Sequence, residues 1–197
     1  VSLGIALTTT GTNVGIKTTG GTNKVTVSEA GSITTGTVNS AYGIYNIGNT
    51  NTTTVAGSIK TTGDDGYGIF NLGSNNTTTV SEAGSITTTG SGAKGIDIYG
   101  DDNVTTVSGT VKATGARSAA LYNVKGDGNS FTLNEGATII GDILARDATG
   151  TNLDATNSKL IFNLGASTSY AYSVSGKGAG TTAGQWTFSD LDGPTQG

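Results

Sequence analysis

Two pairs of adjacent carboxylates are the clearest candidates for chemistry in this sequence, Asp64–Asp65 and Asp101–Asp102. Carboxylates act as a general acid and base, or bind Ca²⁺, only where several of them converge on one point. These two pairs follow different segments of the repeat described below, so we do not expect them to stack on one face. The glycine-rich nonapeptide that binds calcium in other repeat proteins is absent. We therefore predict that the four residues are solvated turn residues and that the chain holds no metal.

A second set of charged residues could line the groove of a β-helical enzyme that degrades polysaccharides. Such an enzyme needs acidic and basic side chains clustered on one surface. Here the candidates are spread over several segments: Asp97, Lys112, Arg117, Asp142 and Arg146. The chain also lacks His and Cys, which excludes Ser-His and Cys-His nucleophiles, CxxC redox centres and the usual zinc ligand sets within it. We predict no catalytic residues, no cofactor and no enzymatic activity.

An array of threonines offers a ligand surface of another kind. Thr52 with Thr54, and Thr77 with Thr79, form T-x-T pairs of the type found on ice-binding solenoids. Neighbouring repeats break the first column of this array with Lys24, Val104 and Ser130. The array therefore favours an ordinary β-sheet surface, and ice binding stays an alternative that thermal hysteresis would test.

Aromatic residues recur in one column of the repeat. Tyr45, Phe70 and Tyr122 align, and each is followed by an asparagine, Asn46, Asn71 and Asn123. Pointing outward, they would form a strip suited to carbohydrate or protein contact. We favour packing at a corner, where they cover a turn, because Asp97 shares the column and would be unfavourable in the interior.

Charge and hydropathy narrow the class of protein further. The net charge is −4 and the ten Lys and Arg residues are scattered, whereas a nucleic-acid binder shows a basic stripe. We therefore predict no nucleic-acid partner. The apolar stretches are too short for a transmembrane helix. Because the first residue is not Met, we expect a mature product or an excised fragment.

The elements that position all these residues follow from an internal repeat of three segments. Segment A reads NKVTV, NTTTV, NTTTV, NVTTV and NSFTL, and its apolar column is Val27, Val55, Val80, Val107 and Leu133. Segment B reads GSITT, GSIKT, GSITT, GTVKA and GATII, and its column is Ile33, Ile59, Ile86, Val111 and Ile139. Segment C is centred on Ile16, Ile44, Ile69, Ile96 and Leu121.

The spacing of these columns predicts an all-β fold. Both the A and the B column span 106 residues in four steps, and each segment is short, rich in β-branched residues and bounded by Gly or Asn. The A-to-B distance alternates between 6 and 4 residues, which keeps the inward and outward parity of a strand. Three strands per turn of about 26 residues describe one rung of a right-handed parallel β-helix, a solenoid.

The repeat also predicts the positions of individual residues within each rung. A threonine column should lie on the outer face of segment A, comprising Thr26, Thr54, Thr79, Thr106 and Thr132. The asparagine that begins each A strand should occupy a left-handed or turn position and hydrogen-bond between rungs. Residues 1–10 should form part of an additional rung, because Ile5 lies 28 residues before Ile33. The chain would then begin within the array.

The repeat fades after Ile139, so we divide the chain into repeat rungs (1–148) and irregular capping rungs of the same solenoid (149–197). In the second part Leu160, Phe162 and Leu164 alternate, as do Tyr170, Tyr172 and Val174, and Trp186 stands beside Phe188. The last rung of a solenoid would otherwise expose its edge and core. These aromatic strands are predicted to cap it.

Rungs of the GSIxTTG and NxTTV type resemble the passenger domains of Gram-negative autotransporters over residues 1–145. EGATIIGDI from Glu135, NSKLIFNLG from Asn157 and QWTFSDLDG from Gln185 resemble the segment that joins such a passenger to its C-terminal cap. The resemblance implies type V secretion, a location at the cell surface or outside the cell via the outer membrane, and an outer-membrane β-barrel at the C-terminus of the full-length protein.

The function expected from these observations is that of a non-catalytic passenger stalk with an adhesive or spacer role. Its partners would be a protein or glycan on a host or neighbouring cell. A β-helical polysaccharide lyase or tailspike-like enzyme, and an ice-binding solenoid, are the alternatives.

Overall fold

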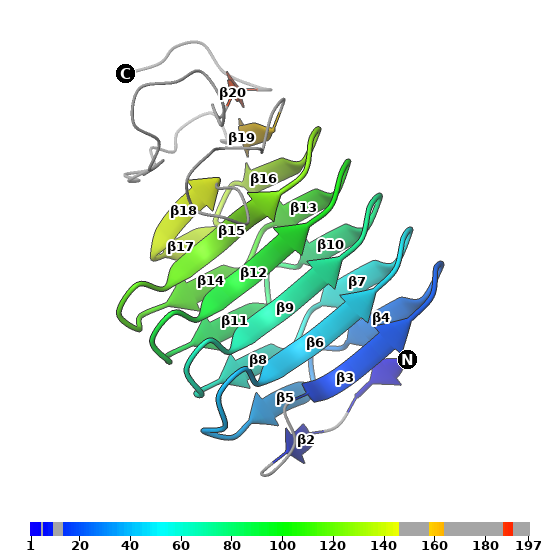
Figure 1. Ribbon diagram of the computed structural model, residues 1–197, viewed down its shortest axis with the longest axis vertical. Coiled ribbons are helices and arrows are strands. Elements are labelled where there is room, and N and C mark those ends of the chain that lie inside the picture. The colour runs from blue at the N-terminus through cyan, green and yellow to red at the C-terminus, as the bar shows by residue number, and fades with distance from the viewer. Residues whose placement is uncertain (5, 10–13, 146–157, 164–186, 191–197) are drawn as a thin grey trace.

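A computed structural model describes residues 1–4, 6–9, 14–145, 158–163 and 187–190, and within these ranges the chain is all β. Twenty strands form three parallel sheets, and the chain passes from one sheet to the next as it winds along a single axis (Figure 1). No helix long and apolar enough to cross a membrane occurs in the described part of the chain.

Each sheet collects one strand from every turn of the chain. Sheet A contains β1 (Ser2–Leu3), β4 (Lys24–Val27), β7 (Thr52–Val55), β10 (Thr77–Val80), β13 (Val104–Val107), β16 (Ser130–Asn134), β19 (Lys159–Asn163) and β20 (Thr187–Asp190). Sheet B contains β2 (Ala6–Thr9), β5 (Ser32–Thr35), β8 (Ser58–Thr61), β11 (Ser85–Thr88), β14 (Thr110–Ala113) and β17 (Thr138–Ile140). Sheet C contains β3 (Val14–Thr19), β6 (Tyr42–Ile47), β9 (Tyr67–Leu72), β12 (Lys94–Tyr99), β15 (Ala119–Lys125) and β18 (Asp142–Ala145).

The registers confirm the predicted parallel solenoid of three strands and about 26 residues per turn. Val27, Val55, Val80, Val107 and Leu133 are consecutive partners in sheet A. The predicted columns of segments B and C pair in the same way, rung on rung. The three repeated segments are therefore the three sides of the solenoid.

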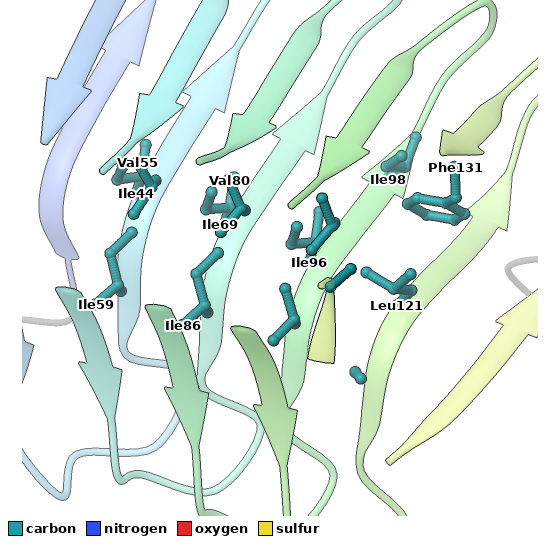
Figure 2. Close-up of a cluster of buried hydrophobic side chains, with 14 of the residues drawn as sticks. Ile44, Val55, Ile59, Ile69, Val80, Ile86, Ile96, Ile98, Leu121 and Phe131 are labelled. Carbon is teal, nitrogen blue, oxygen red and sulfur yellow. The ribbon is translucent and has the colours of Figure 1, made fainter. Parts of the chain in front are cut away.

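The core is the stack of inward side chains from these columns. Figure 2 shows Ile44, Ile69 and Ile96 of sheet C facing Val55 and Val80 of sheet A and Ile59 and Ile86 of sheet B. All seven are buried. Burying a Val or Ile side chain contributes about 1.5–3 kcal/mol. A few inward residues per rung are thus enough to form a core, because each of them is covered by the rungs above and below.

The corner between sheets A and B alternates between a long and a short form. In the long corners that begin at Ser28 and Ser81, the backbone amide of the third residue after the serine donates a hydrogen bond to the serine carbonyl. Gly31 N, for example, donates to Ser28 O over 2.7 Å. In the short corner, a Cβ on Gly57 would lie 2.1 Å from Gly31 O, so the short turn fits tightly against the long one on the preceding rung. The structural repeat is therefore two rungs, and Val27, Val80 and Leu133 are each separated by 53 residues.

The asparagines that begin the sheet A strands form the predicted ladder between rungs. Asn51 Oδ1 accepts a hydrogen bond from the backbone amide of Asn23 over 2.9 Å, and the same contact recurs at Asn76, Asn103 and Asn129. The predicted left-handed position was wrong by one residue. The positive φ belongs to the residue before each asparagine, as at Thr22 and Thr50, because that residue completes the turn and the asparagine directly precedes the strand.

A strip of polar side chains inside the solenoid was not predicted. Asn46 Nδ2 donates to Asn71 Oδ1 over 2.8 Å and to Thr53 Oγ1 over 2.9 Å, and Asn71 Nδ2 donates to Thr78 Oγ1 over 2.9 Å. These residues are buried. The asparagines lie two residues after inward Ile44 and Ile69, so strand parity could have identified them as inward.

The first and last described rungs agree only in part with the sequence predictions. Residues near the N-terminus do form an additional rung, but Leu7 rather than Ile5 pairs with Ile33, and Ile5 lies outside the described residues. Towards the C-terminus, Leu160 and Phe162 are both buried, and β19 pairs with β16. The domain boundary at 148/149 also lies outside the described residues, as do Leu164, Tyr170, Tyr172, Val174 and Trp186.

Candidate interaction face

The outer surface of sheet C differs chemically from the outer surfaces of the other two sheets. Sheets A and B present mostly Thr and Ser outward, interrupted by Lys residues, Val104 and, on the last rungs, Ile140 and Ile161. The outer surface of sheet C, here called the aromatic face, carries large side chains: Tyr42, Tyr45, Ile47, Tyr67, Phe70, Leu72, Lys94, Asp97, Tyr99 and Tyr122. All except Asp97 are partly exposed.

A glycine at the second position of the strand explains how these residues come to lie side by side. A Cβ on Gly43 would lie 2.4 Å from Ile59 Cγ2 and 2.6 Å from Gly68 O, so only glycine allows this close approach. Gly68 and Gly95 occupy the same position on later rungs. The strand therefore holds two inward residues in succession, Gly43 and Ile44, and Tyr42 and Tyr45 both end up outside.

Four aromatic rings on two successive rungs form one cluster. Tyr42 stacks on Tyr67 with ring centroids 5.1 Å apart, and Tyr45 stacks on Phe70, also at 5.1 Å and with an interplanar angle of 12°. Within each rung the contacts are edge to face, at 5.2 Å for Tyr42–Tyr45 and 5.5 Å for Tyr67–Phe70. Because the rings stack along the axis, the cluster covers most ring faces and presents ring edges outward.

Lysines lie against the rings of the same face. Lys17 Nζ is 5.8 Å from the centroid of Tyr45, Lys94 Nζ is 5.1 Å from that of Tyr122, and Lys125 Nζ is 6.0 Å from that of Tyr99. A cation over an aromatic face is attracted by the ring quadrupole. Lys17 thus covers one end of the Tyr45–Phe70 stack, and Lys94 and Lys125 occupy ring faces of Tyr122 and Tyr99, which leaves few ring faces for an external ligand.

The pKa values of two tyrosine hydroxyls on this face are raised. Burial raises the pKa of Tyr42, and nearby Tyr45 and Asp97 add to the shift. Burial also raises the pKa of Tyr67, and Asp97 is the next contributor. Both groups therefore stay neutral hydrogen-bonding hydroxyls at the rim of the cluster.

The aromatic column lies where the sequence aligned it but not at a corner. Tyr45, Phe70, Asp97 and Tyr122 are successive partners in the middle of the sheet C strands, on the outer face. The preference for corner packing over a turn was therefore wrong. Asp97 is buried on the outer face of the sheet because large neighbours on adjacent rungs cover it.

The other candidate residues do not come together. Asp64–Asp65 lie in the turn between β8 and β9 and Asp101–Asp102 in the turn between β12 and β13, all exposed, as predicted. Two of these carboxylates accept backbone amides of the next rung: Asp64 Oδ1 accepts from Ser91 N and Asp101 Oδ1 from Asp127 N. Among the described residues, no group of three or more Asp and Glu could hold a metal ion.

The candidates for polysaccharide cleavage are divided between sheets. Asp97 and Asp142 belong to sheet C, Lys112 belongs to sheet B, and Arg117 lies in the turn that joins them. Arg146 lies outside the described residues. The described members of this set therefore do not share one surface.

The threonine array has the predicted register. The column from Thr26 to Thr132 is continuous and half-buried on the outer face of sheet A. The second column contains Thr52 and Thr77 between Lys24 and Val104. The T-x-T arrangement therefore covers two rungs of this face.

Comparison of the chain with protein-family models, curated proteins and solved structures found no match.

Proposed function

We propose that this chain is part of the non-catalytic stalk of an autotransporter passenger, displayed at or released from the surface of a Gram-negative bacterium. The observation that carries the proposal is the rung-on-rung parallel stacking of repeats that resemble those passengers. A solenoid of this kind gives a rod in which each rung contacts only its neighbours. Such a rod can hold an attached domain away from a cell or contact another surface along its length.

The aromatic face supports an adhesive role in addition to a spacer role. Contiguous apolar side chains on a protein surface mark interaction sites, and Tyr and Phe are enriched at the centres of protein interfaces. The rings on this face are stacked edge-outward, which favours contact with the side chains of a partner protein over stacking on a neutral sugar. The proposed partner is a protein on a host or neighbouring cell.

Surface display is tested on the producing bacterium. Antibodies raised against the purified chain should label intact cells or the culture supernatant, and protease added to intact cells should remove the cell-bound signal. Labelling only after lysis of the cells would overturn the proposed location.

Adhesion is tested with a matched pair of variants. Tyr45→Ser with Phe70→Ser removes two stacked rings, and Thr54→Ser with Thr79→Ser changes two residues at the same rungs on sheet A. We expect the first pair to reduce binding of the protein to host or neighbouring cells at least tenfold and the second to leave it unchanged. Equal binding by both variants would leave the spacer role, and release of reducing ends from acidic polysaccharides would favour the lyase alternative.

A further inference from the structure

Asp97 is a carboxylate within an aromatic surface. It lies on β12 between Phe70 of β9 and Tyr122 of β15, in a column whose other described members are aromatic, basic or aliphatic. Only 3% of its surface is exposed, although it is on the outer face of the sheet. The neighbouring rungs therefore separate this carboxyl group from water.

The polar contacts of Asp97 do not match the needs of a charged carboxylate. The backbone amide of Ile98 is near enough to favour the charged form of the carboxyl group and so to lower its pKa. Oδ1 has no hydrogen-bond partner within the described part of the chain. A buried ionised carboxylate normally needs a partner for each oxygen, and an unmatched polar atom is costly.

Lys94 is the cation that faces Asp97, and other contacts also hold its ammonium. Nζ donates to the Gly92 carbonyl and, over 3.5 Å, to the Arg117 carbonyl, and it lies over the ring of Tyr122. The attraction of Lys94 lowers the pKa of Asp97, but the loss of water on burial is the larger effect and raises that pKa well above its ordinary value. The titratable and aromatic groups around the carboxyl from the adjoining strands are Tyr42 and Tyr45 of β6, Tyr67 and Phe70 of β9, and Tyr122 of β15.

From this geometry we propose that Asp97 is a proton-dependent lock on the aromatic face. When Asp97 is protonated, its side chain completes the stack across the rungs. When it is ionised, the packing of β9, β12 and β15 against one another loosens. Acid then strengthens this side of the solenoid, and alkali weakens it. The lock acts on the surface that we propose for adhesion but does not depend on that function.

The sign of the effect follows from linkage. In the unfolded chain Asp97 ionises near its ordinary pKa of 3.8, whereas in the folded chain it keeps its proton to higher pH. The stabilisation is complete below about pH 3.8. It decreases as pH rises above that value and is lost once pH passes the raised pKa of the folded state.

The test compares the wild type with Asp97→Asn and with Asp142→Asn, whose carboxyl group is exposed on the same face. The urea midpoint is measured at intervals from pH 4 to pH 8. We expect the difference between Asp97→Asn and the wild type to grow with pH in favour of the variant. Asp142→Asn should follow the wild type. A difference that is constant with pH would overturn the proposal.

Two measurements on the wild type keep the test decisive if the variant fails to fold. The carboxyl carbon of Asp97 should titrate by NMR above the range of ordinary aspartates. Amide hydrogen exchange, corrected for its intrinsic pH dependence, should speed up with pH in β9, β12 and β15 more than in β10 and β13. Titration of Asp97 in the ordinary range would refute the lock.

Discussion

Two threonines inside sheet A show how one facing residue decides whether a buried hydroxyl stabilises the protein. Thr78 Oγ1 accepts a hydrogen bond from Asn71 Nδ2 across the interior. On the next rung Ile98 takes the place of that asparagine, and Thr105 Oγ1 has no partner among the described residues. Both threonines are 0% exposed. The same side chain thus occupies two electrostatically different sites.

Replacing each threonine by valine should therefore have opposite effects. Thr78→Val leaves Asn71 Nδ2 buried without an acceptor and should lower the free energy of unfolding by about 1–3 kcal/mol. Thr105→Val removes an unpaired hydroxyl without changing the shape of the side chain, and it should raise the free energy of unfolding by about 1 kcal/mol. Urea denaturation followed by circular dichroism measures both. Loss of stability in both variants would contradict this account of the polar strip.

At the scale of the strand, the glycine of sheet C sets how closely successive rungs approach. A side chain on Gly68 would meet Ile86 Cγ2 at 2.3 Å and Gly95 O at 2.5 Å, and the second contact is with backbone, which cannot rotate away. The fifth rung has Ala120 at this position, where the pairing of β15 with β18 contains an irregularity. Glycine is thus required at this position in the rungs whose sheet C strands pair regularly.

Gly68→Ala should consequently destabilise the solenoid by at least about 1–3 kcal/mol, because the core between sheets B and C is already filled. The matched change in the opposite direction, Ala120→Gly, removes one methyl group and adds backbone freedom, so it should cost only about 1 kcal/mol. Thermal unfolding of the two variants beside the wild type compares them. If Gly68→Ala unfolds at the wild-type temperature, the close approach of the rungs does not limit the sequence.

Much of this strand arrangement could be predicted from the sequence, because the repeat fixes both register and parity. The Val and Ile columns pair rung on rung as aligned, and the corner that alternates between 6 and 4 residues keeps its parity. What could not be predicted depends on contacts between side chains of different rungs. The alignment places Asp97 in the column of Phe70 and Tyr122, but how completely their rings cover its carboxyl group depends on side-chain packing, which the repeat does not encode.

At the scale of the whole molecule, the corners join the rungs in pairs. A long corner at Ser28–Gly31 packs against the short one at Gly57, and the arrangement recurs at Ser81–Gly84 with Gly109. The residues VSEAGSITT occur at 27–35 and again, unchanged, at 80–88. The unit that can be added or removed without changing the alternation of the corners between sheets A and B is therefore 53 residues long, two rungs rather than one.

Deleting residues 28–80 removes one such unit and joins Val27 to Ser81, which recreates the natural sequence across the junction. Ile16 would then stack on Ile96, and the long corner at Ser81 would remain above the short corner at Gly109. Because the energy of a solenoid is a sum over neighbouring rungs, we expect the shortened chain to keep its β-sheet circular dichroism. Its urea m-value should fall in proportion to the lost surface.

Deleting residues 28–81 is the control, since it differs by a single residue. The corner after Val27 would then have odd length, and every residue of the following sheet B strand would turn from the inner to the outer face. Ile86 and its neighbours would face water, so this chain should fail to fold cooperatively, as judged by urea denaturation and gel filtration. Equal stability of the two deletions would mean that the rungs tolerate a loss of parity and that the 53-residue unit has no structural role.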